Sequence, residues 1–160
     1  MLLTLLGMLG SVIGFCVAQT TTQKTEMIRL TRDLGEEFND SDQIFRKIRM
    51  SIERCEKLYN KWEGKYDNDQ INRYLNFFDA LGYYERQGIL DYKVIDHMFG
   101  AYIIEAYEYN EIRRYIEGTQ TKGKQKEAAS DFQNLAKKIE SLPERNELIE
   151  LARRGCSEKN

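Results

Sequence analysis

At 160 residues, the chain has the length of one domain, or of one domain with an appendage. Charged residues make up 31% of the chain and proline occurs once, at Pro143, which predicts helices and argues against a β-rich domain. The net charge is −2 with acids and bases interspersed, which excludes a broad basic surface, so we expect no nucleic-acid partner.

The leader MLLTLLGMLGSVIGFCVA, residues 1–18, contains no charged side chain. As a helix it would rise about 27 Å, close to the hydrocarbon thickness of about 30 Å, so it predicts a single transmembrane helix with the membrane as a partner. Basic residues follow the leader, at Lys24, Arg29 and Arg32, and none precedes it. The positive-inside rule then places the rest of the chain in the cytoplasm, anchored by a single pass to the cell (inner) membrane.

A cleavable signal peptide is the alternative for the same segment. Cys16 and Ala18 are small residues at the spacing for cleavage before Gln19, but the basic n-region is missing, so we favour the anchor. The alternative makes the protein secreted or periplasmic and allows a Cys55–Cys156 disulfide. Small residues close to small-xxx-small spacing leave a homo-oligomer through the leader open: Gly7, Gly10, Ser11 and Gly14.

The three cysteines, Cys16, Cys55 and Cys156, form no close-spaced pair. The sequence therefore contains no zinc motif and no CxxC-type redox motif. With the domain placed in the cytoplasm, we expect three unrelated free thiols in a reducing compartment.

After a polar linker at 19–24, the pattern predicts helices separated by turns. The first is predicted from apolar residues at helical spacing, and it ends at the Asn39-Asp40-Ser41 turn. Its stripe consists of Met27, Leu30, Leu34 and Phe38. The second is predicted over about 42–62 from an amphipathic pattern. Its stripe consists of Ile44, Ile48, Ile52, Cys55 and Tyr59.

The third helix is predicted over about 69–87, with Asp67 or Asn68 as its cap and Gly88 as its end. Asp91 caps a fourth helix, about 92–117, and the short connection predicts an antiparallel hairpin. After a loop at 118–124, a fifth helix spans about 125–141, and Pro143 starts a last short one, about 144–154.

The predicted fold class is therefore all-α. We expect an N-terminal transmembrane helix followed by a small bundle of about four to five helices with a central antiparallel hairpin. The predicted division is the leader at 1–18, the linker at 19–24, a helical domain at 25–117, a loop at 118–124, and C-terminal helices with a tail at 125–160.

One group of polar residues on the predicted fourth helix contains residue types that are common in metal-binding and catalytic sites. His97, Glu105 and Glu108 share a helical face, and Asp96 adjoins the only histidine. A histidine with carboxylates can bind a metal or transfer a proton. However, the helical di-iron and zinc motifs need a second histidine, and no serine is placed for a triad. The sequence therefore predicts no catalytic, metal or cofactor site and no enzyme.

The stretch from Tyr74 to Ile116 resembles the core of a prokaryotic family called domain of unknown function 4760. The similarity lies in an LNFF-type helix, a turn of the form glycine-hydrophobic-hydrophobic-aspartate, and a small residue before an aromatic-rich helix end. The matching residues are Leu75, Asn76, Phe77, Phe78, Gly88, Ile89, Leu90, Asp91, Phe99, Gly100 and Tyr102. The resemblance covers about 25–117 plus the leader. It implies a membrane-anchored helical domain and carries over no active residues.

The function predicted from these features is a single-pass membrane protein whose cytoplasmic helical domain has a protein-interaction or scaffold role. The protein partner is not identified, and Tyr83, Tyr84 and Tyr107 are candidates for its contact surface. Two alternatives remain. One is a secreted or periplasmic helical protein, and the other is a helical bundle that binds a small ligand.

Overall fold

The computed structural model describes residues 25–39, 44–120 and 129–156. Two compact units, Met1–Glu37 and Phe38–Asn160, make up the chain, and each is described by itself. The predicted transmembrane leader, the linker and the end of the first turn lie outside the described residues. Among the residues described, no helix is both long enough and apolar enough to cross a membrane.

The described part of the first unit is helical, as predicted. The Thr31 hydroxyl donates a hydrogen bond to the carbonyl oxygen of Met27, at 2.7 Å. Arg29 pairs with Asp33 one turn later, with 3.8 Å between the charged atoms. Such exposed pairs contribute only about 0.3–0.5 kcal/mol, so they support the helix without fixing its surroundings.

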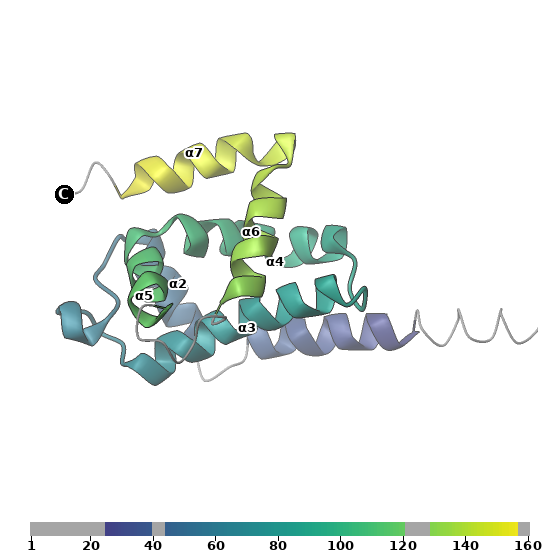
Figure 1. The fold of residues 1–160 in the computed structure, drawn as a ribbon, viewed down its shortest axis with the longest axis horizontal. Coiled ribbons are helices and arrows are strands. Elements are labelled where there is room, and N and C mark those ends of the chain that lie inside the picture. Colours follow the sequence, from purple (N-terminus) through teal and green to yellow (C-terminus); the bar gives the residue numbers. More distant parts are fainter. Residues whose placement is uncertain (1–24, 40–43, 121–128, 157–160) are drawn as a thin grey trace, which may run out of the picture. The chain divides into compact units, whose positions relative to one another are not determined.

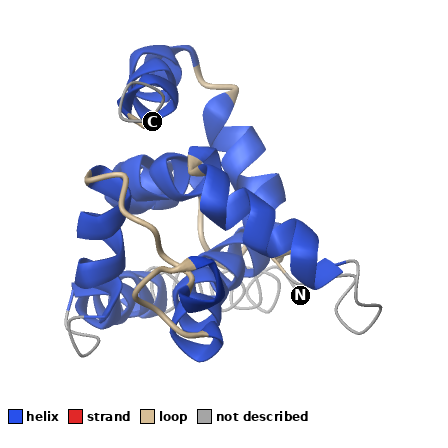
Figure 2. Cartoon of the chain, turned by 90° about the vertical axis from the view of Figure 1, so that its left-hand side faces the viewer, coloured by secondary structure: helices blue, strands red, loops and turns tan. Residues whose placement is uncertain are grey.

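The second unit contains six α-helices and two 3₁₀ turns among the described residues. The α-helices are α2 Ile44–Glu53, α3 Asn68–Arg86, α4 Tyr92–Glu108, α5 Asn110–Gln120, α6 Ser130–Glu140 and α7 Asn146–Gly155. The 3₁₀ turns are η1 Asn60–Trp62 and η2 Pro143–Arg145. The described chain consists of helices and loops (Figure 2), with one isolated β-bridge between Tyr59 and Tyr66. The all-α prediction is therefore confirmed for the part of the chain that the structure describes.

Local signals set both ends of the α3–α4 turn where they were predicted. Asp67 caps α3 through a capping box with Gln70. Gly88 has φ +68°, and its N–H and that of Ile89 donate to carbonyls in the last turn of α3, the Schellman arrangement that favours glycine. Asp91 then caps α4 by accepting a hydrogen bond from the backbone N–H of Lys93, at 2.8 Å. The chain reverses direction at this turn (Figure 1).

Helix α6 packs across α3 and α4 (Figure 1), and its start is fixed by α3. One oxygen of Asp79 accepts hydrogen bonds from the backbone N–H groups of Asp131 and Phe132, both at 3.0 Å. This side chain caps a helix whose own N-cap residue, Ala129, has no side-chain oxygen. Gly82 permits the close approach, because a Cβ there would lie 2.3 Å from the carbonyl oxygen of Asp131.

Aromatic side chains fill the core of the second unit. Phe77 stacks on Phe38 with 5.0 Å between the ring centroids, and Phe99 meets Phe38 edge-on at 5.3 Å. Phe78 stacks on Phe132 of α6 at 5.6 Å. Such pairs contribute packing beyond the area that they bury. The LNFF stretch is therefore core on three of its four residues, with Leu75, Phe77 and Phe78 buried and Asn76 exposed.

The predicted second helix is wrong beyond Glu53. Cys55 adopts a left-handed conformation, with φ +57°, and the N–H groups of Cys55 and Glu56 close a Schellman-type end on Ile52 and Ser51. A loop that includes η1 follows as far as α3. The carboxylate of Glu111 on α5 anchors this loop by accepting the backbone N–H groups of Leu58 and Tyr59.

The predicted fourth helix is in fact two helices. It breaks at Tyr109, whose backbone is extended with ψ 117°. The Tyr109 hydroxyl donates a 2.6 Å hydrogen bond to the carbonyl oxygen of Glu56, in the loop after α2. The apolar stripe continues across the break, so the sequence pattern alone gave no reason to end α4 there.

Candidate binding site at the disulfide

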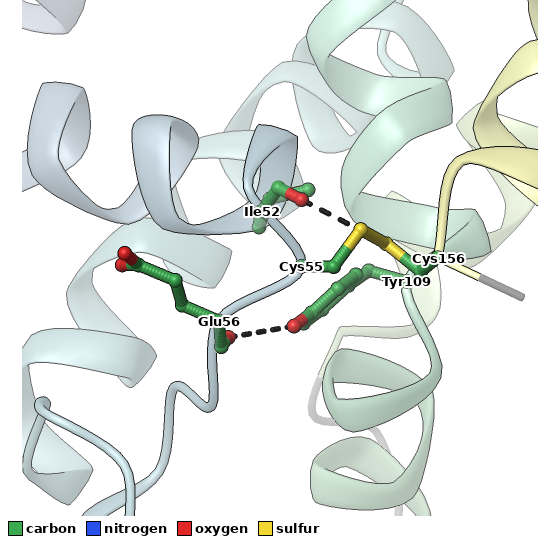
Figure 3. Close-up of a disulfide and its surroundings, with 5 residues drawn as sticks. All are labelled: Ile52, Cys55, Glu56, Tyr109 and Cys156. Carbon is green, nitrogen blue, oxygen red and sulfur yellow. Dashed lines mark hydrogen bonds between the residues drawn. A yellow bond between two sulfur atoms is a disulfide. The ribbon is translucent and has the colours of Figure 1, made fainter. Parts of the chain in front are cut away.

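A disulfide joins Cys55, in the turn after α2, to Cys156, directly after α7 (Figure 3). The two Cα atoms are 5.3 Å apart, within the usual span of a disulfide, although the residues are 101 positions apart in sequence. The Sγ atom of Cys156 also lies 3.9 Å from the carbonyl oxygen of Ile52. The prediction of free thiols is therefore wrong for these two cysteines, and Cys16 lies outside the described residues.

Two cavities meet at this disulfide. The larger has a volume of about 390 Å³ and the smaller about 280 Å³. Both are lined by Cys55, Tyr109, Ala152 and Cys156, so the disulfide and the Tyr109 ring form a wall common to the two. Three elements build this concave surface: the end of α2, the α4–α5 break, and α7. Concave surfaces of this size are where proteins usually bind other molecules.

The larger cavity is polar and its charges are paired. Arg153 of α7 holds the buried Glu108 carboxylate with two hydrogen bonds, at 3.0 and 3.1 Å, and Arg113 adds one at 3.2 Å. Burial opposes ionisation of Glu108, but the hydrogen bond from Arg153 and the two guanidinium charges outweigh it, so the pKa is lowered. Glu140, desolvated and hydrogen-bonded to Glu108, has a raised pKa. This cluster ties α4, α5, α6 and α7 together.

The smaller cavity combines apolar walls with two carboxylates. Its apolar walls are Ile52, Leu148, Leu151, Ala152, Tyr109 and the disulfide. Glu53 and Glu105 supply the carboxylates. Burial raises the pKa of Glu105, the negative charge of Glu53 raises it further, and the positive charge of Arg49 acts in the opposite direction. A groove that holds like charges beside apolar surface favours a cationic ligand.

The four residues of the predicted polar cluster do not converge on one place. Glu105 lines the smaller cavity and Glu108 the larger, while His97 is exposed and lines neither. Asp96 accepts a hydrogen bond from Nε of Arg145, the last residue of η2, at 2.9 Å. In the described part of the chain, no group of three His, Cys, Asp or Glu residues is placed to hold a metal ion.

The remaining predicted residues have packing and turn roles. Phe99 is buried, and Gly88 and Asp91 form the turn between α3 and α4. Gly100 makes room for an ion pair, because a Cβ there would lie 2.3 Å from Asp96 Oδ1 and 3.0 Å from Nη2 of Arg145. Tyr102 is half-buried beneath the guanidinium of Arg49, which lies 4.5 Å from its ring centroid.

The predicted tyrosine contact surface does not coincide with either cavity. Tyr83 is 45% exposed, whereas Tyr84 and Tyr107 are half-buried. The residues that sequence reasoning missed are on α7, Arg153 above all, and at Tyr109. The pairing of Cys55 with Cys156 was considered only within the secreted or periplasmic alternative.

Comparison with protein families gives one match. The family model described as "Domain of unknown function (DUF4760)" matches residues 4–139. The matched segment contains Cys55, Glu105 and Tyr109 but ends before η2, α7 and Cys156. No curated protein and no solved structure matches the chain. One wall of the concave surface is thus built by residues beyond the matched segment.

Proposed function

Because the chain belongs to the family described as domain of unknown function 4760, whose name assigns no reaction, we propose a function from the site itself. The second unit is a partner-binding domain that works in an oxidising compartment outside the cytoplasm. It binds another protein at the concave surface around the disulfide. The observation that carries this proposal is the Cys55–Cys156 bond between two cavities.

Two features of the chain favour opposite sides of the membrane. The basic residues Lys24, Arg29 and Arg32 after the leader favour the cytoplasm. The disulfide favours the outside, because structural disulfides persist in oxidising compartments and are rare in the cytosol. We give the disulfide more weight. The positive-inside rule describes only a bias in the distribution of basic residues, whereas the thiols of the cytosol would reduce the Cys55–Cys156 bond directly. The leader 1–18 then serves as an export signal, either cleaved or retained as an anchor.

Binding is a better account of the site than catalysis. At the larger cavity, Glu108 pairs with Arg113 and Arg153, and Arg153 also pairs with Glu140, so that the cluster joins four helices, which is a structural arrangement. In the smaller cavity, apolar side chains surround two carboxylates, and Leu151 is 60% exposed. Exposed apolar side chains at a concave surface mark contact sites for other molecules. We therefore retain the protein-interaction role predicted from sequence, but we assign the contact surface to the residues around the disulfide and not to Tyr83, Tyr84 and Tyr107.

The compartment is tested on the full chain produced in its host. C-terminal reporters, one active only in the cytoplasm and one only outside it, are expected to report the outside. Intact mass after alkylation is expected to show that Cys55 and Cys156 react only after reduction, and the same mass shows whether residues 1–18 are retained. A cytoplasmic reporter signal with both thiols alkylated without reduction would contradict the proposed compartment.

Partner binding is tested by photocrosslinking in the same cells. A photoreactive residue at Leu151 is expected to give a discrete protein adduct. The same residue at His97, which is also exposed but lines neither cavity, is the matched control and is expected to give none. No adduct from position 151, or the same adduct from both positions, rejects binding at this surface.

A further inference from the structure

We propose that the smaller cavity binds a protein segment that presents a lysine or arginine side chain beside apolar ones. This proposal deepens the partner-binding function proposed above and is independent of the compartment. It identifies the chemistry of the partner from three features of the groove: an apolar wall on α7, two carboxylates that form no salt bridge with a described residue, and a nearby arginine that packs on aromatic rings.

The apolar wall comes from the side of α7 that faces the groove. Leu148, Leu151 and Ala152 lie three and four positions apart, so they share one face of the helix. Ile149 of α7 is buried, at 5% exposure, whereas Leu151 is 60% exposed. With Ile52 across the groove, Leu151 therefore offers apolar surface that an incoming side chain would remove from water.

The two carboxylates of the groove are not held by a salt bridge from any described residue. Within the part of the chain that the structure describes, neither Glu53 nor Glu105 forms an ion pair, in contrast to Glu108, which Arg113 and Arg153 neutralise in the adjacent cavity. Glu105 is half-buried, so its charge is only partly screened by water. A positively charged side chain placed between the two would relieve their mutual repulsion.

Arg49, the basic residue whose charge acts on Glu105, is engaged with aromatic rings. Its guanidinium carbon lies 4.6 Å from the Phe38 ring centroid and 4.5 Å from that of Tyr102, a cation–π arrangement on two sides. Arg49 forms no salt bridge with either carboxylate, so a cation that pairs with both would come from outside the described chain. A divalent metal ion fits poorly, because the described residues contain no group of three metal-ligating side chains. An ammonium or guanidinium group with apolar neighbours fits both the acids and the apolar wall.

The test uses the full chain in nanodiscs of neutral phosphatidylcholine and three synthetic dodecapeptides. The first contains leucine, alanine and lysine in an amphipathic pattern, and in the others every lysine is replaced by glutamine or by glutamate. Binding is followed by fluorescence anisotropy, with empty nanodiscs measured in parallel. The lysine peptide is expected to bind at least about tenfold more tightly than the glutamine peptide, with the glutamate peptide weakest and the preference reduced by salt.

Two charge-matched variants locate the binding. Glu53→Gln/Glu105→Gln is expected to lose about tenfold in affinity for the lysine peptide. Glu144→Gln/Glu147→Gln removes the same charge from exposed positions that line neither cavity, and it is expected to bind like the natural protein. Leu151→Ala is expected to weaken the lysine and glutamine peptides alike, because it removes apolar surface. Each variant must retain an alkylation-resistant disulfide, which shows that the site is folded.

Three outcomes overturn the proposal: equal affinity for the lysine and glutamine peptides, full affinity in Glu53→Gln/Glu105→Gln, or a signal no larger than that of empty nanodiscs. The last outcome would assign the lysine peptide to the lipid surface. Failure here is separable from failure of the proposed function. If the photocrosslink at position 151 forms but the lysine peptide binds no better than the glutamine peptide, partner binding stands and the cationic chemistry is rejected. If the lysine peptide binds better but the C-terminal reporter is active in the cytoplasm, only the proposed compartment is rejected.

Discussion

The disulfide makes the most demanding prediction about stability. The replacement Cys156→Ser opens a loop in which the two cysteines are 101 positions apart. In the chain-entropy description, closing a loop of about 100 residues destabilises the unfolded ensemble by about 4.7 kcal/mol at 25 °C. Domains of ordinary stability unfold with only about 5–15 kcal/mol, so the variant is expected to lose a large part of its free energy of unfolding.

The assay is thermal unfolding of the full chain, followed by the helical circular dichroism signal with and without a phosphine reductant. For a domain of this size each kcal/mol shifts the Tm by about 2–4 °C, so reduction is expected to lower the Tm of the natural protein by about 10–20 °C. Cys156→Ser should unfold at the lower temperature under both conditions, which controls for effects of the reductant elsewhere in the chain.

The reasoning would be refuted by one combination of results. If alkylation shows that both thiols have been released, yet the Tm of the reduced protein equals that of the oxidised one, then the bond does not restrict the unfolded chain. The entropy argument would then be wrong for this protein, whatever the geometry of the folded state.

Three further predictions concern single positions. Cys55→Gly and Cys55→Ser both remove the disulfide, but glycine tolerates the φ of +57°, so Cys55→Gly should be more stable to urea than Cys55→Ser by about 1 kcal/mol. Gly82→Ala places a Cβ 2.3 Å from the carbonyl oxygen of Asp131 and should lose about 1–3 kcal/mol. Gly118→Ala adds a Cβ that would meet no atom within 4 Å beyond its chain neighbours and its own helix backbone, so it should lose nothing in the same titration. Because burial and a neighbouring carboxylate raise the pKa of Glu105, the folded state binds its proton more tightly than the unfolded state, and stability falls as the pH rises through that raised pKa. Glu105→Gln should therefore be about 0.5 kcal/mol more stable than the natural protein at pH 7. In urea titrations at several pH values, this difference in stability should vanish below the ordinary pKa of 4.5. A difference that stays constant with pH would contradict an origin in the Glu105 carboxyl group.

Elements bounded by local chemistry were predictable from the sequence. Asp67, Gly88 and Asp91 act on backbone groups within a few residues, so the ends of α3 and the start of α4 follow from the chain itself. The break at Tyr109 depends instead on a contact between distant segments. The Tyr109 hydroxyl meets the carbonyl of Glu56, 53 positions earlier, and no periodicity in the sequence encodes that contact.

The candidate site was less predictable for the same reason. Glu105 and Glu108 were identified as residues of interest, but their grouping with His97 and Asp96 assumed that one helical face forms one site. The structure separates them because α7 covers part of α4: Arg153 takes Glu108 into an ion cluster, and Arg145 takes Asp96 into another. The position of α7 depends on packing and on the disulfide, neither of which a single sequence displays.

The disulfide also sets the path of a mechanical load. Residues 55–156 are a covalently closed loop, so a pull between Phe38 and the chain after Cys156 is carried by α2 and the sulfur–sulfur bond. Helices α3 to α7 lie off that path and feel no stretching force along the backbone. Reduction returns to the path the whole stretch between the two cysteines, which are 101 positions apart, and each of its residues can extend by up to about 3.5 Å. A chain tethered at one end and pulled at the other would thus be a short link when oxidised and a long, extensible one when reduced.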